Sequence, residues 1–261
     1  MNPAPRAGVR IASLVPSITE LLVALGLAPQ LVARTGFCIH PHGALREVPK
    51  VGGTKDVNLA KLRALAPTHV IVNKDENLLE TVQALRAFVP HVVITHPQGP
   101  EDNLALLTQM HDLFGALPGV PERAQALAAE LGLALQRCRA QDRPGVRVLY
   151  LIWREPWMAV ARDTYIARML AEVGWHSWPD LRGGEVGAAR YPRLAGDEAW
   201  LAQIDRVLLS SEPYRFDARH LPLAQALCPR ARVQLVDGEL LSWYGPRAAA
   251  GLDYLRALAA G

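Results

Sequence analysis

The pattern of apolar and polar residues predicts alternating strands and helices over the first hundred positions. Short runs of β-branched and aliphatic residues predict four strands, at 10–15, 31–35, 68–73 and 91–96. Apolar residues spaced by three or four predict helices between them, at 18–26, 58–67 and 78–88. Asn58 is expected to cap the second of these helices. Repeated β–α units predict a parallel sheet with helices on both faces.

The middle of the chain predicts a helix at 103–114 and then one long helix. Apolar residues recur every three or four positions over 122–139, and at 1.5 Å per residue this helix would be roughly 27 Å long. A second β–α series follows, with strands at 146–153, 205–211 and 232–237 and helices at 164–174 and 246–259. We therefore predict an α/β fold of two Rossmann-like lobes with parallel sheets, joined by one long backbone helix. The N-terminal lobe would be 1–118, the connecting helix 119–143 and the C-terminal lobe 144–261.

Composition narrows the class of protein. The chain has 261 residues, 50% hydrophobic and 20% charged, with a net charge of +3 and acids and bases mixed along its length. A nucleic-acid partner is not expected, because no basic stripe is present. The apolar runs are too short to span a bilayer, and no signal core begins the sequence, so we expect a cytoplasmic protein as written, or a periplasmic one if a leader was removed. Three widely spaced cysteines do not predict a disulfide framework.

Aromatic residues follow three of the predicted strands of the second lobe. WREPW (153–157), EPYRF (212–216) and SWYG (242–245) stand at or just beyond the ends of these strands, whereas NKDEN (73–77) follows a first-lobe strand. Ligands of open α/β sheets bind beyond the carboxyl ends of the strands. One interpretation is that these aromatics simply cap the sheet. We prefer a wall for a large flat ligand, held by stacking and a few polar anchors.

The stretch FCIHPHG (37–43) offers metal-ligating side chains. In an extended conformation Cys38, His40 and His42 would point to one side, and thiolate and imidazole are good ligands for zinc, copper or iron. Pro41 and Gly43 indicate a turn, which would break that alignment. Three hypotheses stay open: a chelating trio, a single contact from Cys38 or His40 to a ligand-borne metal, and plain packing. Ser210-Ser211 lacks the glycines of a nucleophile elbow, which argues against a hydrolase.

Two segments resemble a known family. RIASLVPSITELLVALGLAPQLVART (10–35) and VPKVGGTKDVNLAKLRALAPTHVIVN (48–73) are similar to the first lobe of the helical-backbone (class III) substrate-binding proteins of ABC importers, which take vitamin B12, haem and iron chelates. The resemblance covers most of the chain and is stronger in the first lobe. It implies a ligand cleft between two rigid lobes, a small hinge motion and binding without turnover, so we do not expect an enzyme.

The resemblance also implies roles for particular residues. Trp153 and Trp157 would stack on the ligand, and Arg154 would meet its carboxylates or phosphate, or else pair with Glu155. The same wall would be extended by Tyr191, Tyr214, Trp243 and Tyr244. From the first lobe, the candidates are Phe37, Cys38, His40, Thr54 and Asn73. Importer members dock on transporter arginines through one exposed glutamate per lobe, for which Glu76 or Glu80 and Glu212 are the candidates here.

The preferred hypothesis is a non-catalytic binding protein that holds a corrinoid or iron chelate. It needs no intrinsic cofactor, because the metal belongs to the ligand: a corrinoid, haem or a ferric chelate. Its partners would be that small-molecule chelate and an ABC transporter permease, and we expect a monomer. One alternative is a cytoplasmic metal-site protein or metalloenzyme that uses Cys38, His40 and His42. Another is a relative of the fold that binds a protein partner.

Overall fold

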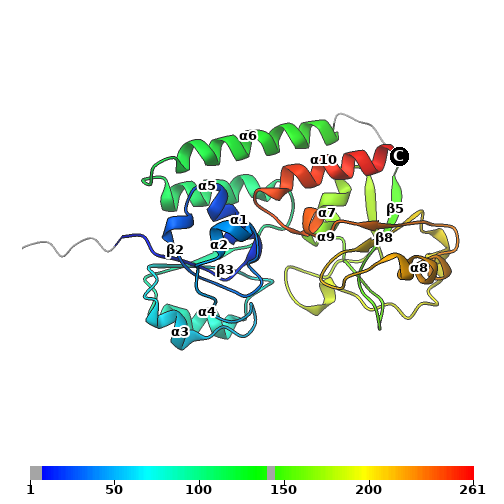
Figure 1. The fold of residues 1–261 in the computed structure, drawn as a ribbon. Coiled ribbons are helices and arrows are strands. Elements are labelled where there is room, and N and C mark those ends of the chain that lie inside the picture. The colour runs from blue at the N-terminus through cyan, green and yellow to red at the C-terminus, as the bar shows by residue number, and fades with distance from the viewer. Residues whose placement is uncertain (1–7, 140–144) are drawn as a thin grey trace, which may run out of the picture. The chain divides into compact units, whose positions relative to one another are not determined.

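The computed structural model describes residues 8–139 and 145–261, which form two compact α/β units. Unit 1 takes the chain up to His96 and again over Leu106–Ala126, and unit 2 takes Pro97–Ala105 and Leu127–Gly261. The long predicted helix is α6, Val120–Arg139, whose 20 residues begin in unit 1 and end in unit 2 (Figure 1). The predicted end of the connecting segment, 140–143, and the first residue of the predicted C-terminal lobe lie outside the described residues.

Unit 1 is built on a four-stranded parallel sheet of order β2-β1-β3-β4. Its strands are β1 (Ile11–Ser13), β2 (Leu31–Arg34), β3 (His69–Asn73) and β4 (His91–Thr95). Its helical elements are α1 (Pro16–Ala24), the 3-10 turn η1 (Ala28–Gln30), α2 (His42–Leu45), α3 (Leu59–Ala64) and α4 (Leu79–Arg86), and α5 (Asp102–Phe114) has residues in both units. The four predicted strands of this half are confirmed. All four leave the sheet at one edge, because parallel strands share their direction.

Local signals set the helix ends of unit 1, and the predicted cap at Asn58 is confirmed. Asn58 Oδ1 accepts the backbone N–H of Lys61 at 2.9 Å, which satisfies one of the unpaired donors of the first turn of α3. Pro16 stands in the first turn of α1, where its missing N–H costs nothing. Gly26 adopts φ +82° just beyond the end of α1, a conformation that favours glycine. These caps keep the connections between strands and helices short.

Unit 2 has a five-stranded sheet in which one short strand runs against the others. Its path is β6-β5-β8-β9, and β7 pairs with β5 off this path. The strands are β5 (Val146–Trp153), β6 (Met158–Ala159), β7 (Trp175–Trp178), β8 (Arg206–Ser210) and β9 (Arg232–Val236). All pairs are parallel except β5 with β6. The two short strands β6 and β7 were not predicted, since β6 has only two residues and the four residues of β7, WHSW, show no alternation of apolar and polar positions.

The helices of unit 2 complete the fold. They are α7 (Tyr165–Ala171), α8 (Leu221–Leu227), α9 (Gly238–Ser242) and α10 (Arg247–Ala260), with 3-10 turns η2 (Ala188–Arg190), η3 (Ala199–Gln203) and η4 (Ala218–His220). Thr164 caps α7 through a bond from the N–H of Ala167. Helix α10 lies beside the second half of α6, where Arg137 pairs with Asp253 at 2.7 Å (Figure 1). The short α8 and α9 were not predicted.

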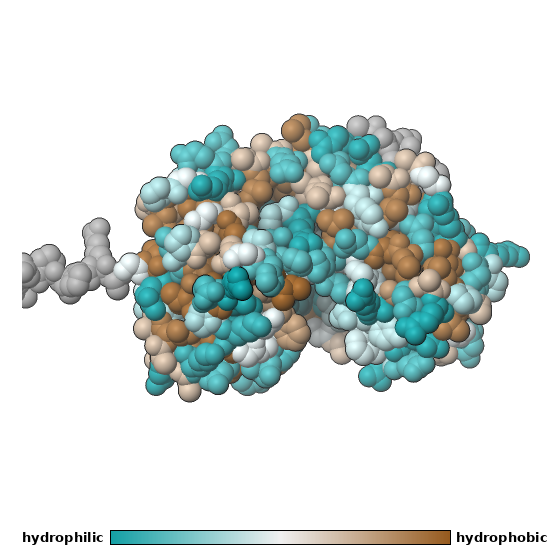
Figure 2. Space-filling view, in the orientation of Figure 1, coloured by the Kyte–Doolittle hydropathy of each residue, from teal (hydrophilic) through white to brown (hydrophobic). Residues whose placement is uncertain are grey.

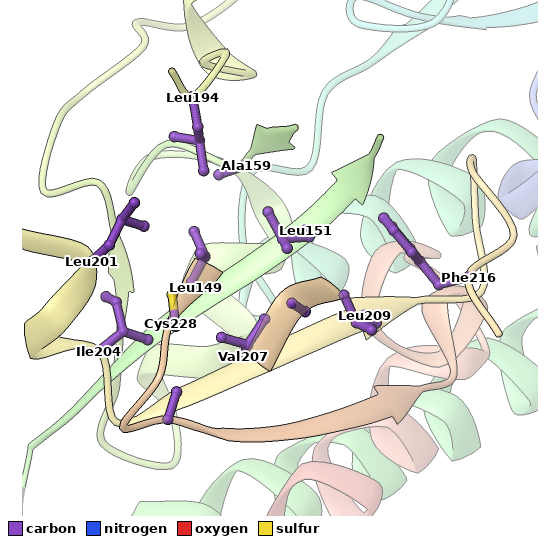
Figure 3. Close-up of a cluster of buried hydrophobic side chains, with 12 residues drawn as sticks. Leu149, Leu151, Ala159, Leu194, Leu201, Ile204, Val207, Leu209, Phe216 and Cys228 are labelled. Atoms are coloured by element: carbon purple, nitrogen blue, oxygen red, sulfur yellow. The ribbon is translucent and has the colours of Figure 1, made fainter. Parts of the chain in front are cut away.

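A buried cluster on one face of the unit 2 sheet reaches its carboxyl edge. Leu149 and Leu151 of β5 lie on the same face as Val207 and Leu209 of β8 (Figure 3). Phe216, five per cent exposed, extends this cluster past the end of β8. The aromatic residues that follow the strands are therefore seated on a packed core.

The described surface is mixed in character. Hydrophilic and hydrophobic residues interleave on the visible faces of both units (Figure 2). Within residues 8–139 and 145–261, no helix combines the length and apolar character needed to cross a bilayer.

Candidate functional site

The carboxyl edge of the unit 2 sheet carries a group of touching aromatic rings. Trp153 ends β5 and meets Tyr214 edge to face, with ring centroids 5.5 Å apart. Tyr214 lies 4.7 Å from Phe216, and Phe216 stacks on Trp157 at 6.0 Å with an interplanar angle of 11°. We call Trp153, Tyr214, Phe216 and Trp157 the aromatic group. Its outermost member is Trp153, which is 41% exposed.

The stretch WREPW forms the connection between two antiparallel strands. Trp153 of β5 pairs with Met158 of β6, so the chain reverses between them. Glu155 has φ +66°, which is uncommon for a residue with a side chain, and a cis peptide bond joins it to Pro156. The reversal leaves Trp153 at the surface and turns Trp157 toward the core. The two tryptophans that the sequence treats alike therefore have different surroundings.

Arg154 lies between an aromatic ring and a carboxylate. Its guanidinium is 5.5 Å from the Trp157 ring centre and its Nη1 is 2.9 Å from Glu155 Oε1. The pairing with Glu155 that the sequence offered as one alternative is present. Arg154 Nε is buried and finds no hydrogen-bond partner among the described residues. Since Glu155 is 78% exposed, this ion pair is screened by water and holds Arg154 only weakly.

The hydroxyl of Tyr214 is held by a histidine that the sequence did not identify. Tyr214 Oη lies 3.0 Å from His220 Nε2, and the backbone N–H of Asp217 donates to His220 Nδ1 at 3.1 Å. Asp217 Oδ1 also lies 3.0 Å from Nδ1, so both nitrogens of the ring are held by neighbours.

Glu212 has an inward carboxyl at the end of β8. Its Oε1 accepts Ser242 Oγ at 2.5 Å and the Trp243 indole N–H at 2.8 Å. Burial raises the pKa of Glu212, although these two hydrogen bonds oppose the shift. The transporter-docking role predicted for Glu212 requires a projecting carboxylate. The hydrogen bonds from Ser242 and Trp243 point to a second role for Glu212, inside unit 2.

The other predicted wall residues of unit 2 occupy different depths. Trp243 is half-buried, and the Arg247 guanidinium lies 4.8 Å from its ring centre. Tyr244 is buried and meets Tyr165 edge to face at 6.0 Å, so it packs within unit 2. Tyr191 is half-buried directly after η2.

In unit 1, one buried asparagine ties three loops together. Asn77 Oδ1 accepts the backbone N–H of Asn73 at 2.9 Å, and Asn77 Nδ2 donates to the carbonyls of Leu14 at 3.3 Å and Thr54 at 3.0 Å. These partners stand after β1, in the turn before α3 and at the end of β3. Asn73 Oδ1 accepts the N–H of Asp75 at 2.8 Å. The amide of predicted site residue Asn73 therefore shapes its own turn, and Thr54 is half-buried beside it.

A buried arginine holds the loop after β2. Arg34 donates to three carbonyls, at 3.2 Å to Leu45, 3.3 Å to Thr35 and 2.9 Å to Cys38. Phe37 projects from this loop and is 62% exposed. Sequence reasoning missed both Arg34 and Asn77. Two of the three partners of Asn77 lie 23 and 63 residues away along the chain. Arg34 bonds to nearby backbone carbonyls, which every sequence contains and which therefore give no signal.

The stretch FCIHPHG does not form a three-ligand metal site. The Cys38 side chain is buried, its Sγ lies 3.2 Å from Thr35 Oγ1, and burial raises the pKa of its thiol. His40 is half-buried before a cis peptide bond to Pro41, and His42 begins the short helix α2, which ends the extended alternation. In the described part of the chain, no group of three or more histidine, cysteine or acidic side chains is placed to hold a metal ion.

The two first-lobe glutamates considered for docking also differ in place. Glu76 is half-buried in the turn after β3, and its negative charge helps to raise the pKa of the Cys38 thiol. Glu80 is exposed in the first turn of α4, where an acidic side chain is favourable to the helix dipole. Docking through either one stays a prediction.

We expect the native protein to react slowly with a thiol reagent. The thiols of Cys38, Cys138 and Cys228 are all buried, and burial raises the pKa of the thiols of Cys38 and Cys228, so little thiolate is exposed near pH 8. In a disulfide-exchange assay, we expect less than about one thiol per protein molecule to react rapidly in the native state. All three thiols should react once denaturant is added. Rapid modification of Cys38 in native protein would show that its sulfur is accessible to ligands.

Comparisons with known proteins agree on the fold. The model of the family described as periplasmic binding protein matches residues 11–191. The vitamin B12-binding protein of Pectobacterium carotovorum subsp. carotovorum (strain PC1) is 23% identical over 189 residues, covering 68% of this chain and 67% of that one. The solved periplasmic vitamin B12 binding protein of Vibrio cholerae has a TM-score of 0.79 at 19% identity, covering 96% of each chain. A periplasmic haem-binding protein from Pseudomonas aeruginosa has a TM-score of 0.74 at 25% identity, covering 95% of this chain and 91% of that one.

The family match settles the resemblance suggested by the first lobe. It spans well over half of the 261 residues and extends from β1 to the residue after η2. The predicted α/β fold of two lobes with parallel sheets is confirmed as well. The chain belongs to the periplasmic binding protein family.

Proposed function

We propose that this protein binds a metal-containing macrocycle or chelate, a corrinoid, haem or a ferric chelate, and does so without catalysis. The observation that carries the proposal is the aromatic group, whose exposed Trp153 stands at the carboxyl edge of the unit 2 sheet. Aromatic walls with few polar groups suit large flat ligands. The names of the similar proteins, which bind vitamin B12 or haem, support the same ligand class.

Polar groups around the aromatic group suit the periphery of such a ligand. Arg154 offers a cation to a carboxylate or phosphate, and Tyr214 offers a hydroxyl group. In unit 1, Phe37 offers an exposed ring at the edge where the strands end. We propose that the metal is part of the ligand and that the protein holds no intrinsic cofactor.

We propose the biological setting from the family. The family is described as periplasmic binding protein, which supports a periplasmic location. We propose that this protein works in the periplasm as a monomer that delivers its ligand to an ABC transporter permease. Docking through Glu76 or Glu80 in unit 1 is part of this proposal. The alternative role as a metal-site protein gains no support from the surroundings of Cys38, His40 and His42.

A fluorescence titration tests the proposal. Purified protein is titrated with cobalamin, cobinamide, haemin and a ferric siderophore, with correction for inner-filter absorption. Six tryptophans report binding, and we expect saturable quenching by one of the ligands. Trp200→Phe is the matched control, because Trp200 pairs with Trp178 at 5.8 Å and has no ring contact with the aromatic group. A flat response to all four ligands would reject the proposal and favour a protein partner.

A further inference from the structure

Trp243 is held from two directions by groups of opposite charge. Its indole N–H donates to Glu212 Oε1 at 2.8 Å, and the Arg247 guanidinium lies 4.8 Å from its ring centre. Arg247 in turn pairs with Glu239 Oε2 at 2.7 Å. The backbone N–H of Trp243 donates to the carbonyl of Glu239, which fixes where the ring leaves α9. Few orientations of the indole satisfy all of these contacts.

The end of β8 is shaped to keep the Glu212 carboxyl inward. Ser210 Oγ donates to the backbone carbonyl of Glu212 at 2.6 Å and accepts the Tyr150 hydroxyl at 2.9 Å. Gly238 leaves the necessary space, since a Cβ there would come within 2.8 Å of Glu212 Cγ and 2.4 Å of Ser210 Oγ. The glutamate is thus enclosed by its neighbours, and its position does not depend on a partner.

Glu212 is partly buried, and burying a carboxyl carries a cost unless it is hydrogen-bonded. Here that cost is offset by Ser242 and Trp243, and a hydrogen bond to a charged acceptor is stronger than one between neutral groups. Of the two donors, only Trp243 belongs to the set of ring-bearing residues at the strand ends. The hydrogen bond to Glu212 therefore bears on the orientation of a ring that we predict to meet the ligand, as well as on the fold.

We propose that Glu212 is a positioning residue, which fixes the indole of Trp243 in the orientation that meets the ligand. The ligand contact rests on the proposed function, whereas the fixed orientation can be measured without ligand. This role differs from transporter docking in what it requires of the side chain. Positioning requires an inward hydrogen-bond acceptor, and docking requires an exposed negative charge.

Four variants separate these roles. Glu212→Gln keeps an acceptor oxygen and removes the charge, and Glu212→Leu removes both. Ser242→Ala removes the other donor to Oε1 and leaves Trp243 bound, so it is the matched control. Trp243→Phe, alone and combined with each variant, isolates the emission of Trp243 by difference.

The first measurement is made without ligand. The emission maximum of Trp243 and its quenching by acrylamide should be unchanged in Glu212→Gln and Ser242→Ala. In Glu212→Leu the emission should shift to longer wavelength and quenching should increase, because the indole is released to solvent. The same emission in Glu212→Leu as in the wild type would overturn the proposal. Where Glu212→Leu does not fold, Glu212→Asp serves instead, since its shorter side chain withdraws the acceptor and keeps the charge.

The second measurement is the affinity for haemin and cobinamide. We expect Glu212→Leu and Trp243→Phe each to weaken binding about 10-fold, and Glu212→Gln to stay within about twofold of the wild type. An equal loss in Glu212→Gln and Glu212→Leu would show that the charge matters and would overturn positioning. If no ligand binds to the wild type, the proposed function fails, and the emission of Trp243 still decides whether Glu212 positions it.

Discussion

Replacing Asn77 with alanine should destabilise the protein by about 3 kcal/mol and weaken ligand binding at the same time. The side chain makes three hydrogen bonds in unit 1, to the N–H of Asn73 and to the carbonyls of Leu14 and Thr54. Alanine removes all three and leaves buried backbone groups without a partner. The turns that these bonds join would separate, and they carry Thr54 and Asn73, which we predict to meet the ligand.

The measurement is urea unfolding, which gives the midpoint and the slope, followed by the ligand titration. Asn77→Asp keeps the acceptor for Asn73 but sets a carboxylate oxygen against the carbonyls of Leu14 and Thr54, so it should be at least as destabilising as alanine. Leu79→Ala, two residues away and 67% exposed, is the control and should change stability by less than about 0.5 kcal/mol. Equal stability of Asn77→Ala and the wild type would mean that the three loops are held by other contacts.

Trp153→Ala should weaken ligand binding by about 1–3 kcal/mol and leave stability nearly unchanged. Trp153 is 41% exposed, so its removal uncovers little of the core. Trp157→Ala should mainly reduce the stability of the protein, because Trp157 stacks on Phe216 and packs against the core cluster of unit 2. We expect that variant to lose about 3 kcal/mol of stability.

Thermal and urea unfolding of both variants, with the titration of each, give the two comparisons. Trp200→Phe again serves as the control for the loss of one fluorophore. Unchanged affinity in Trp153→Ala would remove stacking from the proposal, whatever the result for Trp157. A similar loss of stability in both variants would contradict the difference in burial that separates the two residues.

The sequence predicted the parts of the fold that depend on local pattern. The alternation of β-branched runs with helical periods identified the strands of both units except β6 and β7, and Asn58 marked the start of α3. Strand β7 was missed because its residues, WHSW, show no alternation of apolar and polar positions. Its place beside β5 is set by tertiary pairing, which the local sequence does not show.

The candidate site was predicted less completely, for a physical reason. The aromatic residues after β5 and β8 could be recognised because they follow strands. Their partners could not, because the contact of Trp153 with Tyr214 joins residues far apart in sequence. The same holds for Glu212 and Trp243, and for Asn77 and Leu14. Spacing along the chain also could not show that WREPW is a strand reversal that separates two similar tryptophans.

The hydrogen bonds of Arg34 and Asn77 in unit 1 have a consequence for the kinetics of binding. Arg34 and Asn77 hold their loops in place without any help from a ligand. A ligand then does not have to order these loops when it arrives, so the association rate constant should be similar for all ligands that fit. Differences in affinity among corrinoids, haem and ferric chelates should appear in the dissociation rate constant, and the tightest ligand should be the one that leaves most slowly.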